Sequence, residues 1–162
     1  MAIENNQANS NFQVLYRISV TYDDTNPPQT NNTVLGFTIE RSTVNADNSN
    51  VTTYNVSVTN KRSNTSSGLV IIDLRVPSCY QLSLAYFETL RSNGLIDFYE
   101  LRQGNTEAYI YIRSLTPGET RSFIIDLIRA FEGTCIDRPS SAFEYYNPQQ
   151  PVYVVTPTTT NQ

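Results

Sequence analysis

The sequence predicts a mainly β fold, a two-layer antiparallel β-sandwich with one short crossover helix. Three observations predict it. Apolar and polar residues alternate along many short stretches, which is the pattern of half-buried strands. Turn-forming Gly, Pro, Asn and Asp residues separate these stretches at the short intervals typical of consecutive antiparallel strands. A single stretch, between residues 78 and 93, has the period of an amphipathic helix.

Length and composition exclude several classes of function. A chain of 162 residues is expected to form one domain that buries roughly 70% of its unfolded surface. A net charge of −4, with Lys61 as the only lysine, is poorly suited to nucleic acid or anionic membranes. No apolar run is long enough for membrane insertion. The lack of histidine excludes the common Ser/His and Cys/His nucleophiles and histidine metal sites, so we expect no catalysis, no cofactor and no metal.

The chain divides into a core region and two polar ends. A polar arm is expected at 1–11, a sandwich domain at 12–155 and a Thr-rich tail at 156–162. The domain should begin with a half-buried strand, because apolar residues alternate without a break from Phe12 to Tyr22.

Two more strands are expected in the first half, each with apolar side chains at alternate positions. These positions are Leu35, Phe37 and Ile39 in the first strand and Tyr54, Val56 and Val58 in the second. A polar loop is expected between them at 41–50. In this register Asn55 points outward from the second strand.

The most distinctive stretch is a buried strand followed by the helix. Residues 69–76 are almost all apolar and rich in β-branched side chains, which predicts a central strand buried on both faces and ended by Pro77. The helix is expected to begin either at a capping box of Ser78 and Gln81 or at Ser83.

The helix should have one buried stripe. Leu82, Tyr86 and Leu90 recur at helical spacing, with Ala85 beside them, and Asn93-Gly94 is a C-terminal stop. The opposite face, which we take as the candidate partner-binding surface, carries Ser83, Glu88, Arg91 and Ser92.

Alternation and turn signals predict five strands after the helix. They cover 95–101, 107–113, 122–130, 143–146 and 151–155. Turns are expected at Gln103-Gly104-Asn105 and at Thr116-Pro117-Gly118-Glu119. Asp97 and Glu100 are close in sequence, but the outer face of a sheet explains them better than the acid pair of a glycoside hydrolase.

Asn-x-Ser/Thr triplets and cysteines favour an extracellular protein. The four triplets begin at Asn31, Asn50, Asn55 and Asn64. Cys79 and Cys135 are predicted to form a disulfide, because turn signals place both at strand or helix ends; the alternative is two buried thiols. The N-terminus lacks the features of a signal peptide, so we expect a secreted protein given without its leader. The alternative is a cytosolic domain with chance triplets.

Four segments in order resemble the C-terminal receptor-binding domain of the α2-macroglobulin, complement and thioester-containing protein family. They are 68–78 (GLVIIDLRVPS), the helix ending Leu90-Arg91-Ser92-Asn93, the strand pair around Tyr109-Ile110-Tyr111-Ile112, and 138–148 (RPSSAFEYYNP). The last segment is similar to that family's proline, strand, and acidic residue followed by two tyrosines. The resemblance covers Asn55 to Val155.

The resemblance implies an antiparallel sandwich with one helix that is not catalytic. It also implies a place at the end of a large secreted protein that traps proteases or marks surfaces, with a clearance receptor as partner. In α2-macroglobulin two lysines on the helix dock onto acidic receptor pockets, but the corresponding positions here hold Ser83 and Phe87. The family's thioester motif, Gly-Cys-Gly-Glu-Gln, is absent from this sequence.

Two functions are expected from these observations. The first is an interaction domain of a protease-inhibiting or innate-defence protein, whose partner is a cell-surface receptor or another domain of a larger parent chain. The second is a structural or adhesive extracellular module that self-assembles through strand edges or its polar arms.

Overall fold

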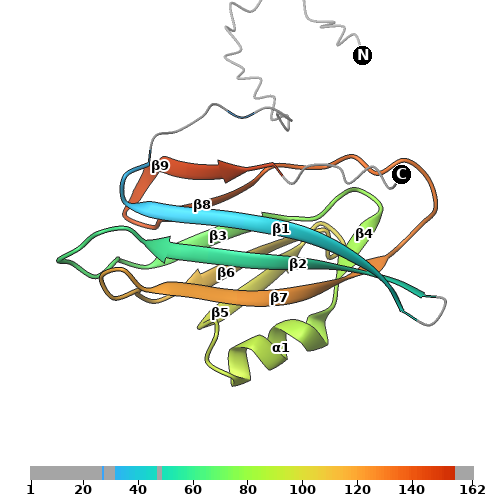
Figure 1. The fold of residues 1–162 in the computed structure, drawn as a ribbon, viewed down its shortest axis with the longest axis horizontal. Helices are drawn as coiled ribbons and strands as arrows, with labels where there is room; N and C mark the ends of the chain where they lie inside the picture. The colour runs from blue at the N-terminus through green and yellow to red at the C-terminus, as the bar shows by residue number, and fades with distance from the viewer. Residues whose placement is uncertain (1–26, 28–31, 47–48, 156–162) are drawn as a thin grey trace, which may run out of the picture.

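The computed structural model describes residue 27, residues 32–46 and residues 49–155. In chain order the elements are β1 (Leu35–Ala46), β2 (Ser49–Asn60), β3 (Val70–Arg75), β4 (Tyr80–Leu82), α1 (Leu84–Ser92), β5 (Phe98–Arg102), β6 (Glu107–Ile112), β7 (Thr120–Arg129), β8 (Ser140–Glu144) and β9 (Asn147–Val154). Figure 1 shows two sheets stacked face to face, with α1 along one side of the stack. The predicted polar arm, first strand and tail (1–11, 12–22 and 156–162) lie outside the described residues.

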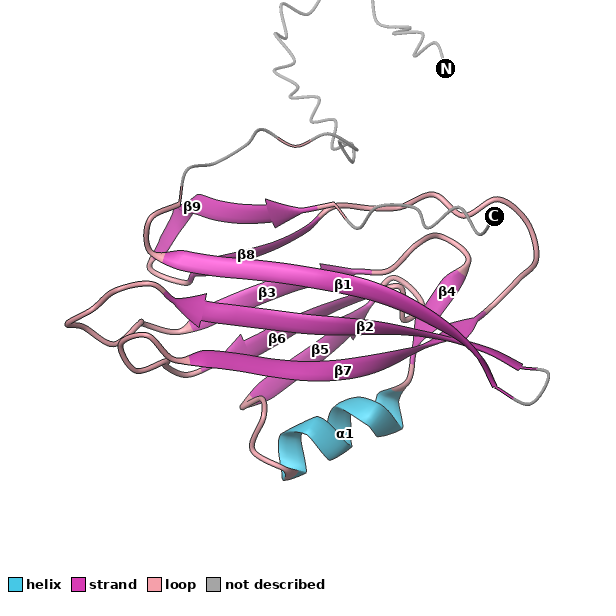
Figure 2. Ribbon diagram, in the orientation of Figure 1, coloured by secondary structure: helices cyan, strands magenta, loops and turns pink. Residues whose placement is uncertain are grey.

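Both sheets are built from antiparallel pairs, which confirms the predicted sandwich. The strand order is β1-β2-β7-β4 in the four-stranded sheet and β5-β6-β3-β8-β9 in the five-stranded sheet. Figure 2 shows the first sheet in front of the second. Because α1 connects the edge strand β4 of one sheet to the edge strand β5 of the other, it is a crossover helix, as predicted.

The core lies between the two inner faces, and β3 is its centre. Val70, Ile72 and Leu74 have no exposed surface, and Ile71, which points to the outer side, is only 6% exposed. The prediction of a central strand buried on both faces is therefore confirmed. Each fully buried side chain of this size stabilises the fold by roughly 1.5–3 kcal/mol. The opposing sheet contributes the inner rows Tyr54, Val56 and Val58 of β2 and Phe123, Ile125 and Leu127 of β7.

The predicted polar loop at 41–50 is wrong, because this region is the end of a long hairpin. β1 and β2 pair along their whole length, up to Ala46 and Ser49. β2 pairs with β7 only from Thr52 to Thr59, so the hairpin end extends past the rest of its sheet. The sequence RSTVNADNSN at 41–50 has no apolar and polar alternation, which is why the pattern did not indicate a strand.

The two predicted turns are confirmed. Gln103, Gly104 and Asn105 all have positive φ, between 49° and 66°, which Gly and Asn tolerate best. In the second turn the N–H of Glu119 donates to the carbonyl oxygen of Thr116 at 3.0 Å. The strand preference for 122–130, over a helix, is confirmed by β7.

The last two strands differ from the prediction in their bounds. β8 ends at Glu144 instead of 146, and β9 already begins at Asn147. The Glu144 carboxylate accepts two hydrogen bonds from Arg62, both 2.7 Å, and one from the N–H of Gly68. The Arg62 guanidinium holds the pKa of Glu144 below its usual value. The chain turns immediately after Glu144 and exposes the next two tyrosines, Tyr145 and Tyr146.

Candidate partner-binding surface

Helix α1 has a well-defined start and end. Ser83 is the N-cap, with extended backbone (φ −90°, ψ 124°), although its side chain makes no capping hydrogen bond. Gly94 has a φ of +70°, and the N–H of Leu95 donates back to the carbonyl oxygen of Leu90 at 3.0 Å. This is the usual glycine-terminated helix end, so the predicted stop is confirmed.

Residues 80–82, expected as the first helical turn, form the short strand β4. They pair with β7, and the N–H of Leu82 donates to the carbonyl oxygen of Asn105 at 2.8 Å. The capping box of Ser78 and Gln81 is therefore wrong. Leu82 is buried as predicted, but it belongs to the sheet rather than to the helix.

The buried side of α1 consists of Phe87 and Leu90. They are 0% and 4% exposed, and the Phe87 ring centroid lies 5.2 Å from that of Tyr99 on β5. The predicted stripe through Tyr86 and Ala85 is wrong: Ala85 is exposed and Tyr86 is half-buried. Leu90 is buried as predicted, but the residue that shares the buried side with it is Phe87, three positions earlier, and not Tyr86.

Tyr86 lies where α1 meets β7. Burial raises the pKa of its hydroxyl, and the charge of Asp126 on β7 raises it further.

The outer face of α1, defined here as Leu84, Glu88, Arg91 and Ser92, is exposed. Glu88, Arg91 and Ser92 lie as predicted, whereas Ser83 is half-buried because it is the N-cap. Leu84 was not predicted in this face and is 53% exposed. Arg91 stands in the last turn, where a cation interacts favourably with the helix dipole. This face offers an apolar side chain, a carboxylate and a guanidinium, and no lysine.

Cys79 and Cys135 form the predicted disulfide. Their Cα atoms are 5.2 Å apart, and they join positions 56 residues apart in the sequence. Next to the bridge, the N–H of Ser78 donates to the carbonyl oxygen of Ile136, and the N–H of Ile136 donates to Oγ of Ser78, both at 3.0 Å. The bridge therefore fastens the β7–β8 connection to the segment that leads into β4 and α1.

The glycosylation triplets fall in different environments. Asn55 is exposed on β2 while its neighbours Tyr54 and Val56 are fully buried, so the predicted register is confirmed. Asn64 is exposed in the β2–β3 connection. Asn50 lies in β2 at the hairpin end, and Asn31 lies outside the described residues. Occupancy of these sites stays a prediction.

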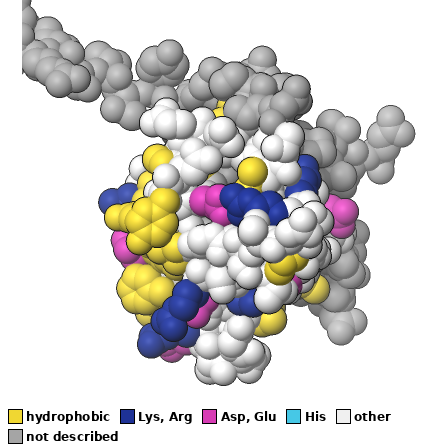
Figure 3. All heavy atoms as spheres, turned by 90° about the vertical axis from the view of Figure 1, so that its left-hand side faces the viewer, with side chains coloured by type: hydrophobic (Ala, Val, Ile, Leu, Met, Phe, Trp, Pro, Cys, Tyr) yellow, Lys and Arg dark blue, Asp and Glu magenta, His cyan; other side chains and the backbone are white. Residues whose placement is uncertain are grey.

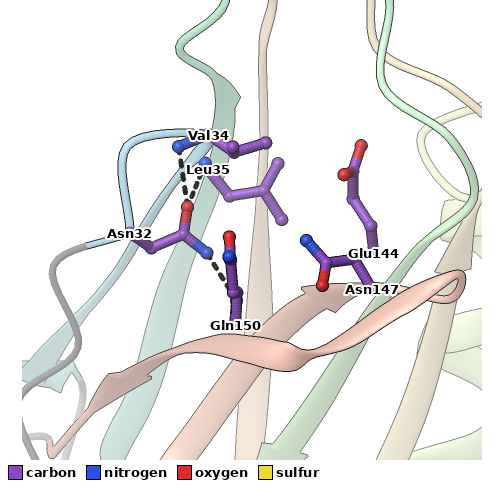
Figure 4. Close-up of a pocket in the computed structure, with 6 residues that line it drawn as sticks. All are labelled: Asn32, Val34, Leu35, Glu144, Asn147 and Gln150. Atoms are coloured by element: carbon purple, nitrogen blue, oxygen red, sulfur yellow. Dashed lines mark hydrogen bonds between the residues drawn. The ribbon is translucent and has the colours of Figure 1, made fainter.

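A shallow surface depression lies where the start of β1 meets β8 and β9 (Figure 4). It is lined by Asn32, Val34, Leu35, Glu144, Asn147 and Gln150. Oδ1 of Asn32 accepts the N–H groups of Val34 and Leu35 at 2.7 and 2.9 Å, and Nδ2 of Asn32 donates to the carbonyl oxygen of Gln150. Asn32 thus ties the start of β1 to β9, a structural role that the sequence analysis did not identify.

The carboxylates Asp97 and Glu100 have separate structural partners. Oδ2 of Asp97 accepts the N–H of Arg113 at 2.8 Å, and Oε1 of Glu100 accepts the Tyr111 hydroxyl at 3.0 Å. The Tyr111 ring in turn lies 5.6 Å from that of Phe98, which is 49% exposed. Figure 3 shows that the end of the sandwich bears hydrophobic patches next to charged pairs. Each of these carboxylates therefore has a structural partner of its own.

One carboxylate on the outer side of the five-stranded sheet is buried. Glu107 is 3% exposed, and its Oε2 has no hydrogen-bond partner among the described residues. Arg138 lies 3.9 Å away from that oxygen. Burial raises the pKa of Glu107, and Asp73 adds to the rise; the three nearby arginines, Arg75, Arg138 and Arg102, oppose it.

Glu107→Gln should stabilise the fold at neutral pH by about 1 kcal/mol, because the amide is neutral and removes the buried charge that raises the pKa of Glu107. Because the pKa of Glu107 is higher in the folded than in the unfolded chain, its ionised form destabilises the fold above the folded-state pKa. That penalty fades as the pH falls through this pKa toward the unfolded value of about 4.3. Urea unfolding at several pH values should show the largest difference from wild type at pH of about 7–8 and none near about pH 4. A difference that does not vary with pH would contradict this.

Two further classes of site were sought in the part of the chain that the structure describes. In that part, no three His, Cys, Asp or Glu residues are placed to hold a metal ion. No helix within the same residues is long and apolar enough to cross a membrane.

The sequence of residues 65–155 matches the family model described as the A-macroglobulin receptor binding domain. The match covers more than half of the chain and spans β3 to β9 with α1. No curated protein matches the chain.

Proposed function

Because the chain belongs to the A-macroglobulin receptor-binding domain family, we propose that it is an extracellular interaction domain of a protease-trapping, innate-defence protein. A domain of this family binds a protein partner and is not a catalyst. We further propose that the whole chain performs no chemistry and that its partner docks on the outer face of α1.

The observation that carries the docking proposal is the division of α1 into two sides. Phe87 and Leu90 hold one side on the sandwich, while Leu84, Glu88 and Arg91 face solvent on the other. In Figure 1 no other described segment covers the lower side of the helix. An exposed leucine between charged residues has the composition of a small apolar contact with a polar rim.

The charges of this face also define the partner that it fits. Paired lysines would suit acidic pockets, but here Glu88 and Arg91 present opposite charges. The expected partner therefore has an apolar contact for Leu84 flanked by one basic and one acidic group. Lys61 lies on a different part of the molecule, directly after β2.

The extracellular location is supported by covalent chemistry. Disulfides persist in oxidising compartments, and the Cys79–Cys135 bridge joins distant parts of the chain. The exposed triplets at Asn55 and Asn64 are compatible with passage through a secretory pathway.

One observation favours self-assembly as a second candidate function. Among the described strands, β1 is an edge strand of 12 residues without proline, and such an edge can pair with another chain. The opposite case is β9, an edge strand in which Pro148 and Pro151 lack the N–H groups that a pairing strand would need.

The double substitution Leu84→Ser with Glu88→Arg should weaken partner binding at least tenfold, which corresponds to the loss of about 1.4 kcal/mol. Both side chains are exposed, so the fold should tolerate the change. The measurement is saturation binding of the fluorescently labelled chain to intact cells. The matched control, Gln149→Arg, alters an exposed residue on β9 and should bind like wild type. Equal binding by all three proteins would contradict docking on α1 and direct attention to the edge of β1.

A further inference from the structure

We propose that the outer face of the four-stranded sheet seats an N-linked glycan on Asn55, with its first sugar packed on Ile124. The inference rests on the extracellular location proposed above, but it does not depend on docking at α1. An unsuccessful binding experiment on α1 would therefore leave it unaffected.

Asn55 and Ile124 are direct neighbours across two strands. They are register partners in the β2–β7 pair, and side chains at such positions share a face with Cβ atoms about 4.5–5.5 Å apart. Ile124 is 53% exposed and Asn55 is exposed beside it. A sugar attached to Asn55 therefore starts next to an apolar side chain that the described protein leaves uncovered.

The surroundings of Ile124 suit both the apolar C–H face of a sugar ring and its polar hydroxyl groups. On one side Ser57 and Ser122 face each other, with their hydroxyl oxygens 2.7 Å apart. On the other side Thr53 is the register partner of Asp126. An apolar centre between polar flanks complements a pyranose ring, whose C–H face packs on apolar groups while its hydroxyl groups form hydrogen bonds.

The acceptor residue Asn55 is exposed in the part of the chain that the structure describes. No hydrogen bond joins the Asn55 side chain to any residue that the structure describes, so a glycan would displace no contact. Figure 2 shows that no described helix or loop crosses the front of β1, β2 and β7. In the transfer reaction the amide nitrogen bonds to C1 of an oligosaccharide, the C1–O bond to a lipid diphosphate carrier breaks, and the amide loses one proton.

Asn64 provides a matched comparison within the same chain. It lies in the β2–β3 connection, and its neighbours Ser63 and Thr65 are exposed and polar. A glycan on Asn64 would extend into solvent. The proposal therefore predicts a glycan packed on the protein at Asn55 and a glycan without protein contacts at Asn64, although the two triplets look alike in the sequence.

The test is expression of the chain behind a secretion leader in a eukaryotic host, followed by enzymatic trimming of the glycans to one sugar. Mass spectrometry should find the sugar on Asn55. The trimmed protein should melt about 2–4 °C above Asn55→Gln, the shift that one modest contact gives a domain of this size. With Ile124→Ser, a change at an exposed position, the same comparison should show no gain, whereas Asn64→Gln should melt like wild type.

A second measurement reports the contact directly. The δ1-methyl resonance of Ile124 should differ between the trimmed protein and Asn55→Gln, whereas that of Ile128 should not. Ile128 is exposed on the same strand about 13 Å away. An unmodified Asn55 in the secreted, folded protein would overturn the proposal. So would an equal thermal gain with serine at position 124, or an unmoved Ile124 resonance.

Discussion

Replacing both cysteines by alanine, Cys79→Ala with Cys135→Ala, should lower the free energy of unfolding by about 4 kcal/mol. The bridge closes a loop of 56 residues, and in the chain-entropy model a loop of this length stabilises the fold by that amount. A loss of this size is a large fraction of the 5–15 kcal/mol typical of a whole domain. Alanine is small enough for the fully buried position of Cys79 and introduces no unpaired polar group.

Urea unfolding followed by circular dichroism measures this effect. The wild-type chain with a reducing agent is the control, and it should unfold at nearly the same midpoint as the double variant. The loss should also be local, with faster amide exchange in the β7–β8 connection, which the bridge fastens. A change below about 1 kcal/mol would mean that the hydrogen bonds of Ser78 and Ile136 already hold this connection.

Phe87→Ala should destabilise the fold by about 3 kcal/mol and release α1 from the sandwich. Phe87 has no exposed surface and packs on Tyr99, and truncation of a buried phenylalanine typically costs 3–5 kcal/mol. The low end applies because α1 is a peripheral element that can relax around the cavity. Amide exchange should show protection lost along α1 before the strands of the sandwich. Leu84→Ala, at a position 53% exposed on the same helix, is the control and should change stability by less than about 0.5 kcal/mol.

Phe87→Lys extends this test to the docking mechanism. The resemblance to α2-macroglobulin places Phe87 at the position of a receptor-binding lysine, but the structure places its side chain under the helix. A lysine there would bury a charge without a partner, so the variant should lose stability without gaining affinity for acidic surfaces. A well-folded Phe87→Lys variant that binds such a surface would show that α1 can rotate on its support.

The elements that could be predicted from the sequence are those in which the local structure restricts the choice of residue at each position. β3 was evident because its two faces are covered, which leaves a run of apolar residues. The turn at Gln103-Gly104-Asn105 was evident because positive φ restricts the choice of residue. β4 was missed because it has three residues, too few for a period to appear, and its pairing with β7 is a tertiary contact.

The helix surface was predicted only in part for a related reason. Leu82 and Leu90 are both buried, so they look like one helical stripe, although Leu82 belongs to a strand. The burial of Phe87 can be recognised only when residues 80–82 are assigned to β4 and not to the helix. The exposure of Glu88, Arg91 and Ser92 was predicted correctly because their positions fall away from the buried side whether the helix begins at Ser78 or at Ser83.

The long hairpin of β1 and β2 determines which gene fragment can encode the complete domain. The family match begins at residue 65, after the hairpin has ended, yet β2 provides the neighbour along which β7 is paired. A gene fragment bounded by the recognisable sequence would encode a five-stranded sheet whose partner layer lacks two of its four strands. Phe123, Ile125 and Leu127 would then lose the inner row beside them, and β7 would become an open edge with a template for aggregation. The unit that recombination can move intact is therefore larger than the stretch that carries the family signature, and it includes the hairpin.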